Sequence, residues 1–346
     1  MQHALAQLEQ FELDFLLVTT PENVRYLSGF TSPEDGEVIL GPEGALLLTD
    51  GRYTVEAARV AKIPYRIVAQ RGREEIYREL LKGKVGFEAE HLTVARLEAL
   101  RRAVPVDWRS TSKLIENLRL YKTPAEVALI QQAATIADSA LAEILPNVHP
   151  GLTELELALD LEAAMRKGGA EGIAFTTIVA SGERSAMPHG AASSKPLAAG
   201  ELITVDFGAF YAGYHSDMTR TFALGQLAQE LEAIFNAVLE AEETVLAAVR
   251  PGIGMAELDH MAREVLEKFH YAQYFTHSLG HGVGLAIHEA PALWSGAVGN
   301  LEAGMIITIE PGVYIPGLGG CRIEDLVYVD ENGYQTLSHA PKALYL

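Results

Sequence analysis

The sequence predicts a two-domain protein of the mixed α/β class. Three observations support this: the length, an alternation of short apolar runs with amphipathic segments in the first half, and a repeated pattern in the second half. A chain of 346 residues is too long for one typical domain and suits two. We place the domains at residues 1–121 and 122–346.

The first half is expected to form a small layered α/β domain. Its short apolar runs alternate with amphipathic stretches, which is typical of strands and helices packed in layers. It has no glycine-rich phosphate loop after a strand, so nothing in it indicates catalysis. The expected strands are Asp14–Val18, Glu37–Leu40, Ala45–Leu48, Tyr65–Val68 and Lys84–Phe87, and the expected helices are Ala4–Phe11, Arg52–Val60, Glu74–Leu81 and Val94–Arg102.

Two helix starts open the second half. Thr123-Pro124-Ala125-Glu126 is a capping box with proline at the first helical position, so a helix is expected to begin there and to run to about Ile144. After a break at Pro150-Gly151, Thr153-Glu154-Leu155-Glu156 opens a second helix in the same way.

The second half also contains an internal echo. His149-Pro150-Gly151-Leu152 recurs 101 residues later as Arg250-Pro251-Gly252-Ile253, and each copy follows a long amphipathic helix, the second at roughly Gln226–Val249. The offset is too long for a solenoid. The echo predicts a duplicated α/β half around a pseudo-twofold axis with a site in the middle. A chance match between helix-start motifs is the alternative.

Bulk properties favour a soluble cytoplasmic protein. The net charge of −19 argues against a nucleic-acid partner, which would favour a basic surface. The single cysteine, Cys321, rules out an internal disulfide framework and suits a reducing compartment. The first residues lack the basic head and apolar run of a secretory signal, and no stretch approaches the ~20 apolar residues of a membrane span. We therefore expect no membrane partner.

Five residues in separate segments are expected to form one metal cage. Four carboxylates and one imidazole make a borderline-hard ligand set that is too anionic to assemble without cations. Such a set suits Mn²⁺, Co²⁺, Zn²⁺ or Fe²⁺. The five residues are Asp206, Asp217, His281, Glu310 and Glu324.

A first predicted hairpin carries two of the carboxylates. Asp206 follows the apolar run Leu202–Val205, which indicates a buried strand. A turn centred between Tyr211 and Ala212 would place Asp206 directly across from Asp217, with Cβ atoms ~4.5–5.5 Å apart. Two ionised carboxylates at that distance repel each other unless one is protonated or a cation bridges them. The alternative is that both face water at the edge of the hairpin.

A second predicted hairpin carries the other two carboxylates. Glu310 ends the buried-looking strand Met305–Ile309, and Glu324 begins the return strand Leu326–Tyr328. The segment Pro316–Gly320 between them is rich in glycine and proline, as a turn should be. Two hairpins that each present a carboxylate pair favour a shared site over four unrelated surface charges.

Histidines complete the candidate site. His281 lies in a glycine-rich segment with His277 and His288 on either side, and alternate glycines there let the backbone approach a ligand closely. The spacing fits neither a dinucleotide fingerprint nor a zincin motif. His189, in Met187-Pro188-His189-Gly190, is either catalytic or an ordinary loop histidine.

With these residues identified, the chain resembles the pita-bread metallopeptidase family, which includes Xaa-Pro dipeptidase (prolidase), aminopeptidase P, methionine aminopeptidase and creatinase. The resemblance is strongest over residues 175–330, where the five ligand positions match in order and context. The first half resembles the N-terminal domain of the prolidase and aminopeptidase P branch, over Asn23–Phe30 and Leu48–Tyr53. The resemblance implies a duplicated α+β catalytic domain of the pita-bread type at residues 122–346.

The resemblance also implies roles for individual residues. Asp206 would bind one metal ion, Asp217 and Glu324 would bridge two, and His281 with Glu310 would complete the second. Mn²⁺ is the first choice of metal. Glu310 would also move a proton, and Arg322 would bind substrate or support a ligand. The histidines that would orient the scissile carbonyl and stabilise the oxyanion are His189, His277 and His288.

The implied activity is metal-dependent hydrolysis of Xaa-Pro bonds in proline-containing di- or oligopeptides by a homodimer. We favour Xaa-Pro dipeptidase, with aminopeptidase P as the alternative. A dipeptidase needs a cation for the terminal carboxylate, and the stretch His288-Glu289-Ala290-Pro291 is followed by Ala292 where some prolidases place an arginine. A non-enzymatic pita-bread scaffold is the alternative from another class.

Overall fold

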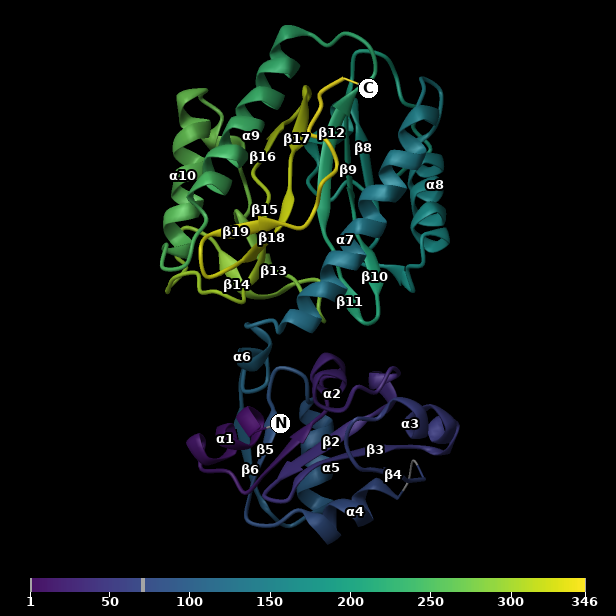
Figure 1. Ribbon diagram of the computed structural model, residues 1–346, viewed down its shortest axis with the longest axis vertical. Coiled ribbons are helices and arrows are strands. Elements are labelled where there is room, and N and C mark those ends of the chain that lie inside the picture. Colours follow the sequence, from purple (N-terminus) through teal and green to yellow (C-terminus); the bar gives the residue numbers. More distant parts are fainter. Residues whose placement is uncertain (1, 70–71, 346) are drawn as a thin grey trace. The chain divides into compact units, whose positions relative to one another are not determined.

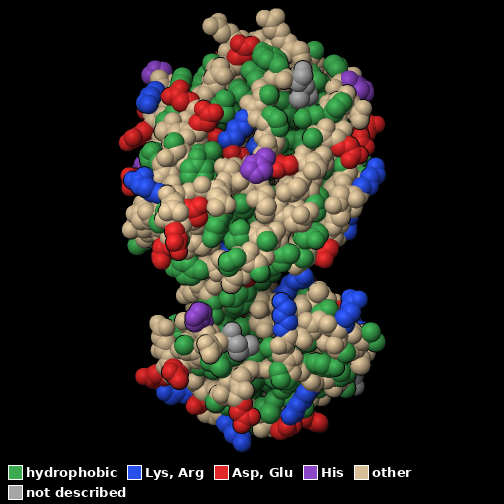
Figure 2. Space-filling model, in the orientation of Figure 1, with side chains coloured by type: hydrophobic (Ala, Val, Ile, Leu, Met, Phe, Trp, Pro, Cys, Tyr) green, Lys and Arg blue, Asp and Glu red, His purple; other side chains and the backbone are tan. Residues whose placement is uncertain are grey.

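The structure is a computed structural model that describes residues 2–69 and 72–345. It divides into two compact units, Met1–Arg119 and Leu120–Leu346, drawn in Figure 1. The predicted boundary between residues 121 and 122 lies two positions after this division. No helix among the described residues is both long and apolar enough to cross a membrane. On the face drawn in Figure 2, acidic and basic side chains are interspersed with apolar ones.

The first unit is built on a six-stranded sheet of order β4-β3-β2-β1-β5-β6. The pairs β1–β5, β5–β6 and β3–β4 are parallel, and the pairs β1–β2 and β2–β3 are antiparallel. The strands are β1 (Phe15–Val18), β2 (Glu37–Gly41), β3 (Gly44–Thr49), β4 (Tyr65–Ile67), β5 (Lys84–Glu88) and β6 (Asp107–Thr111), and the helices are α1 (Gln2–Gln10), α2 (Pro21–Ser28), α3 (Thr54–Val60), α4 (Arg73–Leu80), α5 (Val94–Ala103) and α6 (Glu116–Arg119).

Apolar side chains bury both faces of this sheet. Leu16 and Val18 pack on one face with residues of α1, α2 and α3, while Leu17 packs on the other with residues of α4 and α5. Neighbouring residues of one strand point to opposite faces, so an unbroken apolar run indicates a strand covered on both sides. The predicted layered α/β arrangement and its five predicted strands are confirmed.

The sequence did not predict α2 and β6. β6 lies at the edge of the sheet, and only Trp108 and Thr111 of its five residues are buried, so it lacks an apolar run. α2 is only eight residues long, and its buried face includes Asn23 and Ser28. Both elements are held by their neighbours rather than by a strong local pattern.

The second unit consists of two similar halves. Its strands are β7 (Gly172–Ile173), β8 (Ile178–Ser181), β9 (Leu202–Phe207), β10 (Ala209–Tyr211), β11 (Tyr214–His215), β12 (Met218–Ala223), β13 (Gly280–Gly282), β14 (Glu289–Leu293), β15 (Ile306–Ile309), β16 (Gly312–Ile315), β17 (Gly319–Arg322), β18 (Asp325–Val329) and β19 (Tyr334–Thr336). Its helices are α7 (Pro124–Ile144), α8 (Glu154–Lys167), α9 (Gln229–Ala248) and α10 (Met255–Lys268).

In each half, a long helix and a shorter helix cover antiparallel strands. The α7–α8 pair and the α9–α10 pair lie on opposite sides of the strands in Figure 1. α8 and α10 are both 14 residues long, and their first residues, Glu154 and Met255, keep the 101-residue offset of the sequence echo. Both capping boxes form as predicted at the starts of α7 and α8. The predicted duplication is visible in this order of elements.

The predicted register of the first hairpin is wrong. Asp206 lies opposite Thr219 rather than Asp217. The reason is the turn, which is centred one residue later than predicted, at Ala212 and Gly213 with φ of 49° and 87°. A two-residue hairpin turn of this type needs positive φ at both positions. Asp217 is two residues from Thr219, and this spacing still keeps it on the same side of the hairpin as Asp206.

Candidate metal centre

The predicted ligands lie where strands of the second unit end or change partner. Asp206 is near the end of β9, and Asp217 lies between β11 and β12. Glu310 lies between β15 and β16, and Glu324 between β17 and β18, while His281 is the middle residue of β13. The two halves therefore present carboxylates at matching interruptions of their hairpins.

Glycines allow the strands to approach closely at these points. A Cβ on Gly208 would lie 1.9 Å from the Ser216 carbonyl oxygen, directly before Asp217. A Cβ on Gly280 would lie 2.0 Å from the Thr308 carbonyl oxygen. From the sequence, we expected the glycines around His281 to let the backbone approach a ligand closely. The close neighbours of Gly280 and Gly282 are instead main-chain atoms of adjoining segments.

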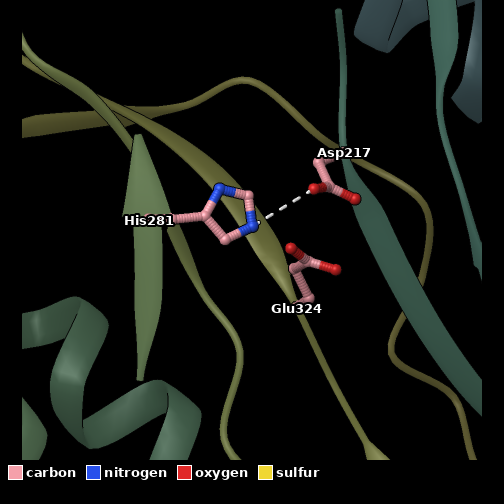
Figure 3. Close-up of side chains that lie close together, drawn as sticks. All are labelled: Asp217, His281 and Glu324. Carbon is pink, nitrogen blue, oxygen red and sulfur yellow. Dashed lines mark ion pairs between the residues drawn. The ribbon is translucent and has the colours of Figure 1, made fainter. Parts of the chain in front are cut away.

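Three of the predicted ligands converge most tightly. One ligand atom each of Asp217, His281 and Glu324 lies within 4.8 Å of the others, and Figure 3 shows the imidazole directed toward both carboxylates. His281 Nε2 is 3.5 Å from Asp217 Oδ2 and 3.4 Å from Glu310 Oε1. Four of the five predicted ligands thus surround one point, from strands far apart in the sequence.

The imidazole of His281 is in the form that binds metals. Its Nδ1 is 3.0 Å from the Gly282 carbonyl oxygen, which only accepts, so Nδ1 carries the proton and Nε2 faces the carboxylates with its lone pair. Burial lowers the pKa of His281 to about 4. The ring is therefore neutral at physiological pH, as a metal ligand must be.

The carboxylates are in electrostatic conflict without a cation. Burial raises the pKa of Asp217 well above its ordinary value, and the charges of Glu324, Asp206 and Glu310 add to the effect. Burial likewise raises the pKa of Glu324 well above its usual range and that of Glu310 to about 8. Such shifts are expected where several acidic groups share one buried site.

Two buried oxygens in this cluster lack any protein partner. Asp206 Oδ1 and Glu324 Oε1 have no hydrogen-bond donor within the described part of the chain. Buried oxygens are nearly always satisfied, so two unsatisfied ones in a single acidic cluster indicate a missing positive ligand. Carboxylate oxygens with one neutral imidazole form a donor set suited to divalent ions. The residues present therefore fit a metal centre.

Arg322 holds the fifth predicted ligand in place. Its Nη2 donates to Asp206 Oδ2 at 2.6 Å, and its Nη1 donates to the Tyr314 hydroxyl at 2.7 Å. Nη1 also donates to the Pro188 carbonyl oxygen at 3.2 Å, and Nε donates to Thr219 Oγ1 at 3.1 Å. The Arg322 side chain is 4% exposed, so it orients Asp206 from within the protein.

Three supporting side chains were not predicted from the sequence. Thr219 Oγ1 donates to Glu324 Oε2 at 2.7 Å, and Thr308 Oγ1 donates to Glu310 Oε1 at 3.2 Å. Each threonine lies two residues from a predicted ligand, at the spacing that shares one face of a strand, and this signal could have revealed them. Tyr314, between Arg322 and His277, carries no comparable local signal.

His277 is fixed in one tautomer by its neighbours. Its Nδ1 donates to the Ser278 carbonyl oxygen at 2.8 Å, so its Nε2 accepts from the Tyr314 hydroxyl at 2.9 Å. Burial lowers the pKa of His277 to about 4, which keeps the ring neutral. Both ring nitrogens are therefore occupied within the protein.

The two other histidines face the same cavity. The His288 ring lies edge to face with His281 at 4.4 Å between centroids, and His189 is exposed on a loop. All nine residues that the sequence proposed for the site line one cavity of about 630 Å³. The other lining residues are Phe175, Thr176, Ile178, Pro188, Ala191 and Ser278. An acidic cage beside apolar and histidine walls can take a small peptide whose carbonyl reaches the cage.

Comparisons with known proteins agree with this arrangement. Residues 128–331 match the family model described as metallopeptidase family M24, and residues 1–121 match the creatinase/prolidase N-terminal domain. An Xaa-Pro dipeptidase of Pyrococcus furiosus is 40% identical over an alignment 353 positions long, which covers 99% of this chain and 100% of the relative.

Two solved structures are similar over almost the whole chain. The Xaa-Pro dipeptidase from Bacillus anthracis superposes with a TM-score of 0.96 at 39% identity, covering 100% of this chain and 98% of that one. An X-Pro aminopeptidase from Thermotoga maritima superposes with a TM-score of 0.90 at 34% identity, covering 99% and 100%. The expected pita-bread fold, with its separate N-terminal domain, is confirmed.

Proposed function

The chain belongs to metallopeptidase family M24, and we propose that it hydrolyses Xaa-Pro peptide bonds as an Xaa-Pro dipeptidase. The observation that carries the proposal is the convergence of two buried and two half-buried carboxylates and one neutral imidazole in a single cavity. Relatives named Xaa-Pro dipeptidase that align over nearly the full length support the choice of substrate.

We propose that the cage holds two divalent ions, with Mn²⁺ as the first choice and Co²⁺, Zn²⁺ and Fe²⁺ as alternatives. Two such ions, when bound, supply an activated water and polarise the scissile carbonyl. The buried oxygens of Asp206 and Glu324 that have no hydrogen-bond donor among the described residues support the binding of cations at these carboxylates. The residues that would hold the ions are Asp206, Asp217, His281, Glu310 and Glu324.

The chain's own residues would handle protons and orientation. The nitrogen of an Xaa-Pro bond carries no hydrogen and must receive a proton to leave as an amine. Glu310 is half-buried beside His281 and accepts a hydrogen bond from Thr308, and we assign it to take a proton from water and deliver it to that nitrogen. His189 and His288 would orient the carbonyl and stabilise the developing oxyanion.

His277 and Arg322 would act as supports. The ring nitrogens of His277 are both engaged within the protein, so we assign it to holding Tyr314 rather than to contact with the substrate. Arg322 donates to four acceptors and would hold Asp206 in register with the other ligands. In both assignments the residue keeps a neighbouring side chain in place and does not contact the substrate.

One observation favours aminopeptidase P as a second candidate. Among the described residues that line the cavity, Arg322 is the only arginine or lysine, and four of its five N–H donors are already bonded within the protein. A dipeptidase must bind the free carboxylate of the substrate's proline, for which an arginine is the usual partner. In this chain that contact would fall to His189 or His288 or to a group outside the cavity lining.

The test compares Ala-Pro with Ala-Pro-Ala on the metal-loaded protein, with Ala-Ala as a control lacking proline. The proposal predicts a kcat/KM for Ala-Pro at least tenfold above that for Ala-Pro-Ala, and no turnover of Ala-Ala. A preference for the tripeptide would assign the aminopeptidase P function. Absence of turnover for both proline substrates would refute Xaa-Pro hydrolysis.

We further propose that the protein works in the cytoplasm as a homodimer. The single, buried Cys321 supports a reducing compartment, and the resemblance to homodimeric pita-bread peptidases supports the oligomeric state. Sedimentation equilibrium tests the dimer: a mass near twice 37.5 kDa is expected, and a mass of one chain would contradict it.

A further inference from the structure

Glu154 is a fully buried carboxylate that takes no part in the metal cage. It is the first residue of α8 and is 0% exposed. Its Oε1 accepts from the Ser181 amide and hydroxyl, both at 2.8 Å, and its Oε2 accepts from the Ser193 amide at 3.1 Å and hydroxyl at 2.6 Å. Arg184 Nε donates to Oε2 at 3.0 Å and compensates the charge. Both oxygens of this buried group are therefore saturated.

The two serines are the ends of one loop, residues 181–193, which we call the His189 loop. The main chain of α8 reinforces the far end, because the Leu155 amide donates to the Ser193 carbonyl oxygen at 2.9 Å. Arg184 also crosses the loop and donates to the Ala191 carbonyl oxygen at 2.7 Å. Glu154 and Arg184 thus bridge the two ends of a 13-residue loop, and their hydrogen bonds help to offset the conformational entropy that the loop loses on ordering.

The His189 loop is tied on its inner side to the strand that carries Arg322. The Gly320 amide of β17 donates to Ser185 Oγ at 2.8 Å, and Arg322 Nη1 donates to the Pro188 carbonyl oxygen at 3.2 Å. These bonds bring the loop against the cage, whereas Glu154 fixes its two ends. The loop is thus held at its two ends, at Ser185 and at Pro188, around the residue that enters the cavity.

The imidazole of His189 depends on this framework for its position. It lies in a turn in which the Gly190 amide donates to the Met187 carbonyl oxygen at 3.0 Å. The side chain is exposed at the cavity, and among the described residues no hydrogen bond orients its ring. Its location is thus set by the backbone of the loop.

We propose that Glu154 is a positioning residue that sets His189 over the metal cage. The inference rests on the proposed function, in which His189 contacts the substrate carbonyl. Glu154→Gln keeps the shape of the side chain, but its amide nitrogen cannot accept the bonds that the lost carboxylate oxygen accepted. The ends of the loop then loosen, and a misplacement of about 1 Å at a reacting group can cost on the order of 100-fold in rate.

The main experiment is a double-mutant cycle on the metal-loaded protein with Ala-Pro as substrate. Glu154→Gln is expected to lower kcat at least tenfold while the bound metal stays at the wild-type level. In a His189→Ala background the same change is expected to have no further effect, because the group it positions is gone. The matched control is Glu156→Gln, in the same helical turn, whose carboxylate is exposed and, within the described ranges 2–69 and 72–345, accepts hydrogen bonds from Thr153 alone. It should stay within twofold of wild type.

The cycle separates positioning from a purely structural role. If the double variant loses kcat by the product of the two single losses, the inference is wrong. A wild-type kcat in either single variant would also overturn it. If Glu154→Gln fails to fold, Ser193→Ala removes one of the same bonds at the far end of the loop. That variant should show a smaller kcat loss with the same dependence on His189.

Hydrogen–deuterium exchange gives a readout that needs no activity. Amides of the His189 loop should exchange at least tenfold faster in Glu154→Gln, while those of β9 and β15 keep their wild-type rates. Unchanged exchange in the loop would refute the fastening by Glu154. If the wild-type protein does not hydrolyse Ala-Pro, the proposed function fails, and the exchange data still decide whether Glu154 holds the loop.

Discussion

Replacing Asp217 by asparagine should change stability in opposite directions with and without metal. Asp217 is 5 % exposed and shares the cage with three other carboxylates. Without a cation these groups repel one another, and burial together with this repulsion raises the pKa values of Asp217, Glu310 and Glu324. Asparagine removes one negative charge at nearly constant shape, so the metal-free protein should become more stable. With metal bound, the same substitution removes a ligand and should destabilise.

The separation of the ligands sets the magnitude. Ligand atoms of Asp217 and Glu324 lie within 4.8 Å. At an effective dielectric constant of about 20, two like charges at that distance repel by roughly 3 kcal/mol. Protonation relieves part of this repulsion. The free energy of unfolding of the metal-free variant should therefore exceed that of the metal-free wild type by about 1–2 kcal/mol. For a domain of this size, that gain raises Tm by about 2–8 °C.

With metal bound, the wild type should have a higher Tm than Asp217→Asn, which is the reverse of the order without metal. A ligand at 100 times its Kd stabilises the folded state by about 2.7 kcal/mol, and the variant should lose most of this gain. Thermal melts of the wild type and of Asp217→Asn, in a chelator and in excess Mn²⁺, measure all four values. The order of Tm is expected to invert between the two conditions.

A buried aspartate outside the cage provides the control. Asp259 is 0% exposed, pairs with Arg263 at 2.8 Å and accepts from the Leu279 amide at 3.2 Å. Asp259→Asn should lower Tm in both conditions because it breaks a satisfied pair, at a cost of about 1–3 kcal/mol. If Asp217→Asn also melts below wild type in the chelator, the carboxylates are not in conflict and our reading of the cage is wrong.

Three further substitutions test other parts of the structure. Gly208→Ala places a Cβ 1.9 Å from the Ser216 carbonyl oxygen, so it should lower the free energy of unfolding by about 1–3 kcal/mol and weaken Mn²⁺ binding measured by calorimetry. As the control, Gly51→Ala places a Cβ with no atom within 4 Å and should change neither quantity. Lys342→Met removes the ammonium that lies 2.6 Å from the buried carboxylates of both Glu242 and Asp325. The free energy of unfolding measured in urea should fall by about 3 kcal/mol, and an unchanged midpoint would contradict this. His288→Ala should slow turnover of Ala-Pro about 100-fold while metal stays bound, and an unchanged rate would remove His288 from the reaction.

Local chemistry made much of the fold predictable. The capping boxes at Thr123 and Thr153 satisfy the first helical amides within four residues of chain, so the starts of α7 and α8 follow from sequence alone. Carboxylates directly after apolar runs, such as Asp206 and Glu310, indicate charged groups at the ends of buried strands. That pattern is sufficient to indicate candidate ligands from the sequence alone.

Features that depend on distant segments were not predictable in the same way. The register of the first hairpin depends on Ala212 adopting positive φ, which its residue type does not signal. The contacts of Arg322 with Asp206 and Tyr314 join three strands, and no local spacing encodes them. The function of Glu154 in holding the His189 loop is equally invisible, because in the sequence it is only the second residue of a helix-start motif.

Counting bound metal during activation tests the central claim most directly. Metal-free protein would be titrated with Mn²⁺ while bound ions per chain and hydrolysis of Ala-Pro are measured on the same samples. The account predicts that activity rises from zero and saturates as the second ion binds, and that Glu324→Gln fails to retain both ions. Full turnover in protein that holds no divalent ion would contradict it.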